Sequence, residues 1–129
     1  MTELTMFHDS VAWQKSMDLS VAVYAATSSF PKQEIFGVTN QLRRASVSIP
    51  SNIAEGKGRL SSNELLHFLG IARGSALEVQ TQLELSIRLN FGNKEQLSAA
   101  KTLAIEVARI LNSSIATLRS RQTSKPRRA

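Results

Sequence analysis

Residues 34–55 read EIFGVTNQLRRASVSIPSNIAE, and this stretch decides the fold. Its apolar side chains recur at intervals of three and four residues, the spacing of one face of an α-helix. The pattern passes through Pro50 without changing register, although a proline inside a helix removes one hydrogen bond and costs roughly 3 kcal/mol. We therefore predict one helix over residues 34–55, kinked at Pro50 and stopped by Gly56 and Gly58. The apolar positions are Ile35, Val38, Leu42, Ala45, Ile49 and Ile53.

Polar side chains surround the proline in this helix. Ser48, Ser51 and Asn52 can donate hydrogen bonds to backbone carbonyls. We expect them to satisfy the carbonyls that Pro50 leaves without a donor. A ligand site built from the same three side chains is the less favoured interpretation.

Three further helices are predicted around this stretch, over residues 10–28, 61–90 and 93–121. The third helix of the chain opens on a Ser-Ser-Asn-Glu capping box, and Gly92 separates it from the fourth, which Asn93 can cap. Strand-like alternation is absent, so the chain is predicted to be all-α, an up-down-up-down four-helix bundle. The first helix bears two neighbouring stripes, one of Trp13, Met17, Val21 and Tyr24, the other of Ala12, Leu19, Val23 and Ala26. The stripe of the fourth helix is Leu97, Ala100, Ala104, Val107, Leu111 and Leu118, interrupted by Ser114.

The third and fourth helices are more apolar than a bundle alone requires. A helix that faces only its own bundle needs an apolar stripe about 100° wide. Wider coverage predicts a second burial partner, and another copy of the chain is the simplest one. Gly70 and Gly74 would let a helix approach closely, either within the bundle or from another subunit. The additional apolar residues are Leu66, Ile71, Leu77 and Leu85 in the third helix and Leu103, Ile105, Ile110 and Ile115 in the fourth.

The net charge of +6 lies entirely at the C-terminal end of the chain. Residues 1–106 hold ten basic and ten acidic side chains, whereas residues 107–129 hold six basic side chains and no acidic one. Such segregation predicts an anionic partner for this end, or a solvated tail. The apolar pattern stops at Gln122, so we expect a bundle domain over residues 1–121 and a basic flexible tail over residues 122–129.

A longer stretch around the proline, QLRRASVSIPSNIAEGKGR at residues 41–59, resembles a known family. This is the family of bacterial four-helix bundle proteins that includes those encoded in intervening sequences of 23S ribosomal RNA genes. The resemblance covers residues 7–90. The fourth helix is more loosely similar to the accessory variability protein of diversity-generating retroelements. The resemblance implies a homopentamer, nucleic-acid association in some members, reverse-transcriptase binding in the retroelement branch, and no established enzymatic activity.

Two groups of basic residues are candidates for contact with a nucleic-acid backbone, because guanidinium groups bind phosphate in bidentate fashion. Arg43, Arg44 and Arg59 lie within the family-like stretch. The alternative for Arg43 or Arg44 is an ion pair with a carboxylate of a neighbouring helix or subunit. The second group is C-terminal, and the helix macrodipole gives Arg119 and Arg121 a structural alternative. Its members are Arg119, Arg121, Lys125, Arg127 and Arg128.

Several classes of protein are excluded by composition and motifs. The chain has no Cys, no Gly-x-Ser-x-Gly elbow and no glycine-rich phosphate loop, so we expect no enzymatic activity and no cofactor. Glu64 and His67 have the spacing of a di-iron ligand pair, but His8, the other histidine, has no glutamate three residues before it, so no metal site is expected. The chain shows no signal peptide and no apolar run of about 18 residues, which favours a cytoplasmic protein without membrane contact.

Two functional hypotheses follow. The first is a non-enzymatic homo-oligomer, pentameric if the resemblance holds, that binds the backbone of RNA or DNA through its basic C-termini. The second is an interaction scaffold whose bundle surface docks a partner enzyme such as a reverse transcriptase.

Overall fold

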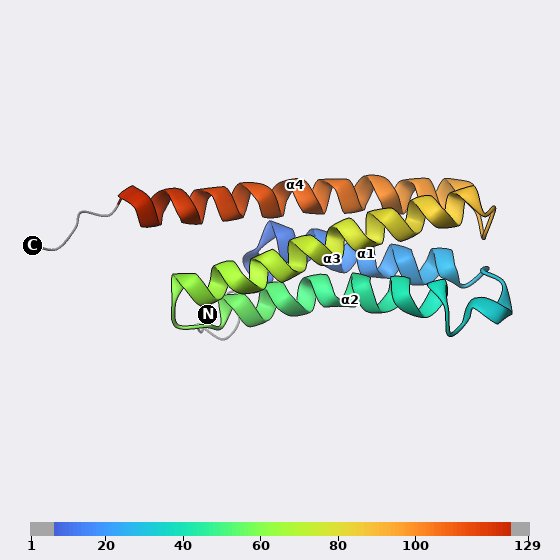
Figure 1. The fold of residues 1–129 in the computed structure, drawn as a ribbon, viewed down its shortest axis with the longest axis horizontal. Helices are drawn as coiled ribbons and strands as arrows, with labels where there is room; N and C mark the ends of the chain where they lie inside the picture. Colours follow the sequence, from blue (N-terminus) through green and yellow to red (C-terminus); the bar gives the residue numbers. More distant parts are fainter. Residues whose placement is uncertain (1–6, 125–129) are drawn as a thin grey trace, which may run out of the picture.

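Four antiparallel helices and short 3-10 turns are the regular elements of residues 7–124, the part of the chain that the computed structural model describes (Figure 1). Helices α1 and α3 each pack against both α2 and α4, so the four helices form a closed ring around one core. This arrangement confirms the predicted all-α, up-down-up-down four-helix bundle. The elements are α1 (Val11–Thr27), η2 (Lys32–Glu34), α2 (Val38–Lys57), α3 (Ser62–Arg88) and α4 (Lys94–Ser124).

The core is built from one stripe of each helix. In α1 the stripe of Ala12, Leu19, Val23 and Ala26 is buried, whereas the neighbouring stripe that contains Met17 and Val21 is largely exposed. In α4 the predicted stripe is buried as far as Leu111, and Ile115 continues the buried face where Ser114 interrupts the pattern. The largest fully buried side chains are Leu19, Leu42, Ile49, Ile53, Leu83, Leu97 and Leu111.

Helix α2 begins four residues later than the sequence pattern predicts. Residues 32–34 form the turn η2, and the carboxylate of Glu34 accepts a hydrogen bond from the backbone N–H of Val38 at 3.4 Å. Gly37 occupies the N-cap position. The prediction that Ile35 belongs to the core stripe is therefore wrong, since Ile35 lies before the helix and is exposed.

Helix α2 runs through Pro50 without a break, as predicted. Proline has no N–H, so the carbonyl of Ser46, four residues earlier, loses its helical donor. The hydroxyl of Ser20 on α1 donates to this carbonyl at 2.9 Å. The expectation that neighbours of Pro50 would do so is wrong, because Ser48 instead bonds Ser75 on α3 and Asn52 donates back to Ser48.

The end of α2 depends on two glycines with different roles. Gly58 is the C-cap residue, and its N–H donates to the carbonyl of Ala54 at 3.2 Å. Gly56 is not the predicted stop, because it lies inside α2 and is buried against α3. A Cβ atom added there would lie 2.9 Å from the Cβ of Phe68. Gly56 thus permits close packing of α2 on α3.

The two predicted N-caps of α3 and α4 are confirmed. Ser61 Oγ accepts from the N–H of Glu64 at 3.2 Å at the start of α3. Asn93 Oδ1 accepts from the N–H of Gln96 at 2.9 Å at the start of α4. Gly92, between the two helices, has a φ of +63°.

Candidate nucleic-acid interface

The C-terminal end of α4 projects beyond the connection between α2 and α3 (Figure 1). The helix continues to Ser124, past the predicted start of the tail at Gln122, and Gln122 donates to Asn63 on α3 at 3.0 Å. Arg119 and Arg121 therefore lie on an ordered helix end, where the macrodipole favours cations. The other predicted site residues of this group, Lys125, Arg127 and Arg128, lie outside the described residues.

Arg59 is engaged at the same end of the bundle. Its guanidinium lies 3.6 Å from the carboxylate of Glu55 and 3.9 Å from that of Glu64. It also lies over the ring of Phe68, 4.8 Å from the ring centroid. The two carboxylates oppose its charge, which makes Arg59 a link between α2 and α3 more than a phosphate ligand.

Arg43 and Arg44 have different surroundings in the bundle. Arg43 Nε donates to Thr27 Oγ1 on α1 at 2.9 Å, and its guanidinium lies 4.7 Å from the centroid of Tyr24. Neither arginine forms an ion pair with a carboxylate within residues 7–124, so the expected pairing inside the subunit is wrong. Arg44 is exposed and lines a polar groove of about 440 Å³ between α2 and α3, which Glu78 also lines.

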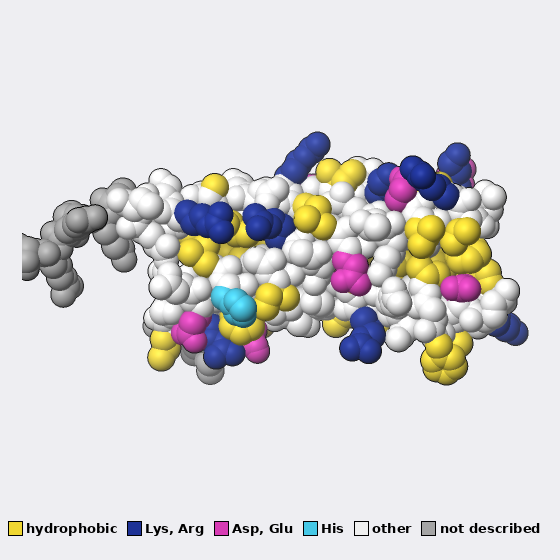
Figure 2. Space-filling view, in the orientation of Figure 1, with side chains coloured by type: hydrophobic (Ala, Val, Ile, Leu, Met, Phe, Trp, Pro, Cys, Tyr) yellow, Lys and Arg dark blue, Asp and Glu magenta, His cyan; other side chains and the backbone are white. Residues whose placement is uncertain are grey.

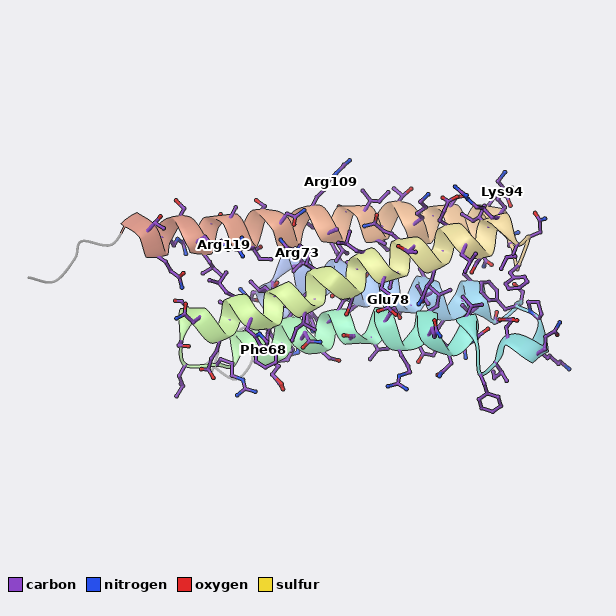
Figure 3. All side chains as sticks on the ribbon, viewed as in Figure 1. Phe68, Arg73, Glu78, Lys94, Arg109 and Arg119 are labelled. Atoms are coloured by element: carbon purple, nitrogen blue, oxygen red, sulfur yellow. The ribbon has the colours of Figure 1, made fainter. Side chains whose placement is uncertain are left out.

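A basic side chain that the sequence analysis did not select lies between α3 and α4. Arg73 is half-buried, and its guanidinium donates to the side-chain oxygen of Asn112 at 3.3 Å. Figure 3 shows Arg73 and Arg119 along the boundary of these two helices, whereas Arg109 points away from it. The available signal was the absence of any acidic residue between Glu64 and Glu78.

The opposite end of the bundle holds an acid between two cations. Glu84 accepts hydrogen bonds from Lys101 on α4 and from Arg88 at 3.0 Å. The ammonium of Lys101, and then the guanidinium of Arg88, hold the pKa of the Glu84 carboxyl below its usual value. The charges of Lys101 and Arg88 are therefore opposed by the Glu84 carboxylate within the bundle.

Helix α1 carries four exposed large apolar residues, Val11, Met17, Val21 and Tyr24, and Val47 of α2 is exposed as well. Val21, at 68% exposure, lies on the outward stripe of α1 with Met17 and Tyr24. Between the two helices is an apolar hollow of about 350 Å³ lined by Trp13, Met17, Ser20, Val47, Pro50, Ser51 and Ala54. We call these residues, with Val21 and Tyr24, the α1–α2 face.

The predicted excess of apolar side chains on α3 and α4 is divided between surface and core. Ile71, Leu77 and Leu85 on α3 are exposed. The additional residues of α4 are half-buried or buried, as Ile115 is. Gly70 and Gly74 have open space where a Cβ would lie, so packing inside the subunit does not require either glycine.

Neither a metal centre nor a membrane span is found in the described part of the chain. Residues 7–124 contain no group of three His, Asp or Glu side chains placed to hold a metal ion. The carboxylate of Glu64 pairs with Arg59 and its N–H donates to the N-cap residue Ser61, while the ring centroids of His67 and Phe68 lie 5.3 Å apart. None of the described helices combines the length and the hydropathy needed to cross a bilayer.

Comparison with known proteins gives a family and a related structure. Residues 8–113 match the family model for the 23S rRNA-intervening sequence protein. Five solved chains match, among them a crystal structure of a protein of unknown function from the S23 ribosomal protein family of Bacteroides thetaiotaomicron. The two chains are 29% identical with a TM-score of 0.73, over 81% of this chain and 98% of that one. No curated protein matches.

Proposed function

This chain belongs to the 23S rRNA-intervening sequence protein family, and we propose that it is a non-enzymatic homo-oligomer that binds the phosphate backbone of RNA or DNA. The observation that carries the proposal is the basic end of α4. Glu106 is the last acidic residue of the sequence, and six basic residues follow it. Arg119 is exposed on the last turns of α4, beside the N-terminal part of α3 (Figure 3), and the helix continues beyond it past the end of the bundle (Figure 1).

The chemistry of this end supports contact with phosphates and not with bases. Arginine presents a planar fork of donors that matches phosphate oxygens. Phe91 is the last aromatic residue of the sequence, so the C-terminal end offers no ring on which a base could stack. Binding of this kind is independent of base sequence and weakens steeply as the salt concentration rises.

Self-association would multiply the effect of each basic end. The exposed apolar residues of the α1–α2 face support a subunit contact there, because apolar surface of this kind favours burial by a partner. If five subunits assemble, as the family resemblance implies, a charge of +6 on each gives +30 for the ring. Several linked ends then bind one polyanion more tightly than a single end does.

The test is RNA binding across a salt series by fluorescence anisotropy. In the test variant each of the five C-terminal cations becomes glutamine. In the control variant Lys32→Gln and Lys94→Gln remove exposed cations at the opposite end of the bundle. If each of the five contacts one phosphate, the slope of log K against log salt falls by about 4 in the test variant and is unchanged in the control. The five are Arg119, Arg121, Lys125, Arg127 and Arg128.

Failure to bind RNA or DNA at low salt would refute the proposed function, and equal binding by both variants would refute the role of the C-terminal end. The second candidate function is a scaffold that docks a partner enzyme such as a reverse transcriptase. The α1–α2 face favours it, since a partner protein could bury the same apolar hollow. A chain that is monomeric by light scattering and binds no nucleic acid would favour the scaffold.

A further inference from the structure

The arginines of the bundle fall into two groups, according to whether a carboxylate opposes their charge. Arg59 and Arg88 lie within 4 Å of glutamates. Arg73 is held by the neutral amide of Asn112, and no carboxylate within residues 7–124 lies within ion-pair distance of it. The amide orients the guanidinium without opposing its charge. No carboxylate of the described residues therefore offsets the charge of Arg73.

The register of α3 and α4 places Arg119 on the same edge of the bundle as Arg73. The Arg73–Asn112 and Asn63–Gln122 contacts are ten residues apart on each helix, so the two helices run antiparallel in constant register. Arg119 is seven residues after Asn112, two helical turns further along the same face of α4. The two arginines therefore line one groove, with backbone attachments about 10 Å apart along it (Figure 3).

Few acidic side chains belong to the stretches of α3 and α4 that border this groove, and Glu64, at its end, pairs with Arg59. The sequence has no acidic residue between Glu64 and Glu78 and none after Glu106. Figure 2 shows Lys and Arg side chains, bordered by apolar ones, on this part of the surface. Gly70 lies on the outer side of α3 one turn before Arg73, and a Cβ added there would meet no atom within 4 Å.

We propose that this groove, from Asn63 and Gln122 to Arg73 and Asn112, binds a phosphodiester backbone and extends the C-terminal site onto the body of the bundle. The proposal rests on the proposed function, and Arg119 belongs to both parts. Donors from two helices would hold successive parts of one strand, which fixes its direction along α3.

The experiment uses the full chain, with fluorescent hairpins of RNA and of DNA of equal length titrated across a salt series. Gly70→Glu places a carboxylate at the outer side of the groove, one turn from Arg73, and Gly70→Gln places a neutral side chain of the same size there. Both changes replace a glycine in a helix interior with a better helix former, so neither should unfold the protein. Arg73→Gln removes the charge directly, and Arg88→Gln removes a compensated arginine of the same helix as a control.

We expect Gly70→Glu and Arg73→Gln to weaken binding at low salt by about threefold to tenfold and to reduce the salt slope by about 1. Gly70→Gln and Arg88→Gln should stay within about twofold of the unchanged chain. Equal effects of Gly70→Glu and Gly70→Gln would overturn the proposal, as would wild-type binding by Arg73→Gln. Binding that still depends on the C-terminal cations would then leave the proposed function standing without the groove. Comparison of the two hairpins decides whether the strand is RNA, DNA or either.

Discussion

The hydrogen bond between Ser20 and Ser46 allows a quantitative test of how α2 tolerates its internal proline. Ser20 Oγ lies 2.9 Å from the carbonyl oxygen of Ser46 and 3.1 Å from that of Ser16, so one hydroxyl proton serves two acceptors. Only the first acceptor lacks a helical donor, because residue 50 is proline. Ser20→Ala should leave the Ser46 carbonyl buried and unsatisfied.

The expected loss of stability follows from these contacts. An unsatisfied buried backbone group costs about 1–3 kcal/mol, and alanine returns a few tenths through its helix propensity. We therefore expect Ser20→Ala to destabilise the protein by about 1–2 kcal/mol. In a Pro50→Ala background, the new N–H of residue 50 can donate to the Ser46 carbonyl. There, Ser20→Ala should cost less than about 0.5 kcal/mol, which gives a coupling free energy of about 1 kcal/mol or more.

The assay is urea unfolding of the four proteins of this double-mutant cycle, at one protein concentration because the proposed self-association would contribute to apparent stability. Ser86→Ala provides the control. Ser86 is fully buried and bonds only its own helix, to the carbonyl of Gln82 at 2.8 Å. Ser86→Ala should lower the free energy of unfolding by the same amount in the wild-type chain and in the Pro50→Ala background. If Ser20→Ala also costs the same in both backgrounds, Ser20 does not replace the donor that the proline lacks.

Three further changes test other parts of the structure. Gly92→Ala should destabilise the protein by about 1–4 kcal/mol, because the φ of residue 92 is +63° and the new Cβ would lie 2.9 Å from the ring of Phe30. Thermal unfolding measures the effect, and an unchanged melting temperature would contradict the prediction. Val21→Glu should lower the mass found by light scattering while helix content by circular dichroism is kept, and an unchanged mass would remove this position from the subunit contact. The pKa of Glu84 is lowered in the folded chain, so its bond to Lys101 contributes stability above the ordinary glutamate pKa of about 4.3, and this contribution is lost as the pH falls through the lowered pKa. Glu84→Gln should therefore make the free energy of unfolding depend less on pH in the acid range. An unchanged pH dependence there would refute the assignment.

The number and type of the helices could be predicted because helical periodicity depends on local spacing alone. Both serine and asparagine caps were predictable for the same reason, since capping involves residues three positions apart. The start of α2 was not. The spacing of Ile35 fits the stripe, but the carboxylate of Glu34 and the backbone of Gly37 end the pattern before the helix begins. A periodic pattern does not reveal where a side chain competes for the first N–H of a helix.

The partners of Pro50 illustrate a second limit. The sequence offers polar neighbours within two residues of the proline, and these were the reasonable donors to predict. The donor is Ser20, which lies thirty residues away in the sequence and faces the carbonyl only because α1 packs on α2. Which of the two stripes of α1 is buried is likewise decided by packing. Both have helical spacing, and only the position of α1 against its neighbours selects the stripe of Leu19 and Val23 for the core.

The arrangement of charges in space differs from their count along the chain. A balance of ten basic and ten acidic residues over residues 1–106 suggests a neutral bundle with a basic end. In space, however, Glu84 opposes two cations at one end and Arg59 occupies two glutamates at the other. The acids used in those clusters are unavailable to Arg73, so a neutral bundle still carries a basic groove beside its basic end. Because field strength depends on which charges are adjacent, the count along the chain understates how far the proposed phosphate-binding surface reaches.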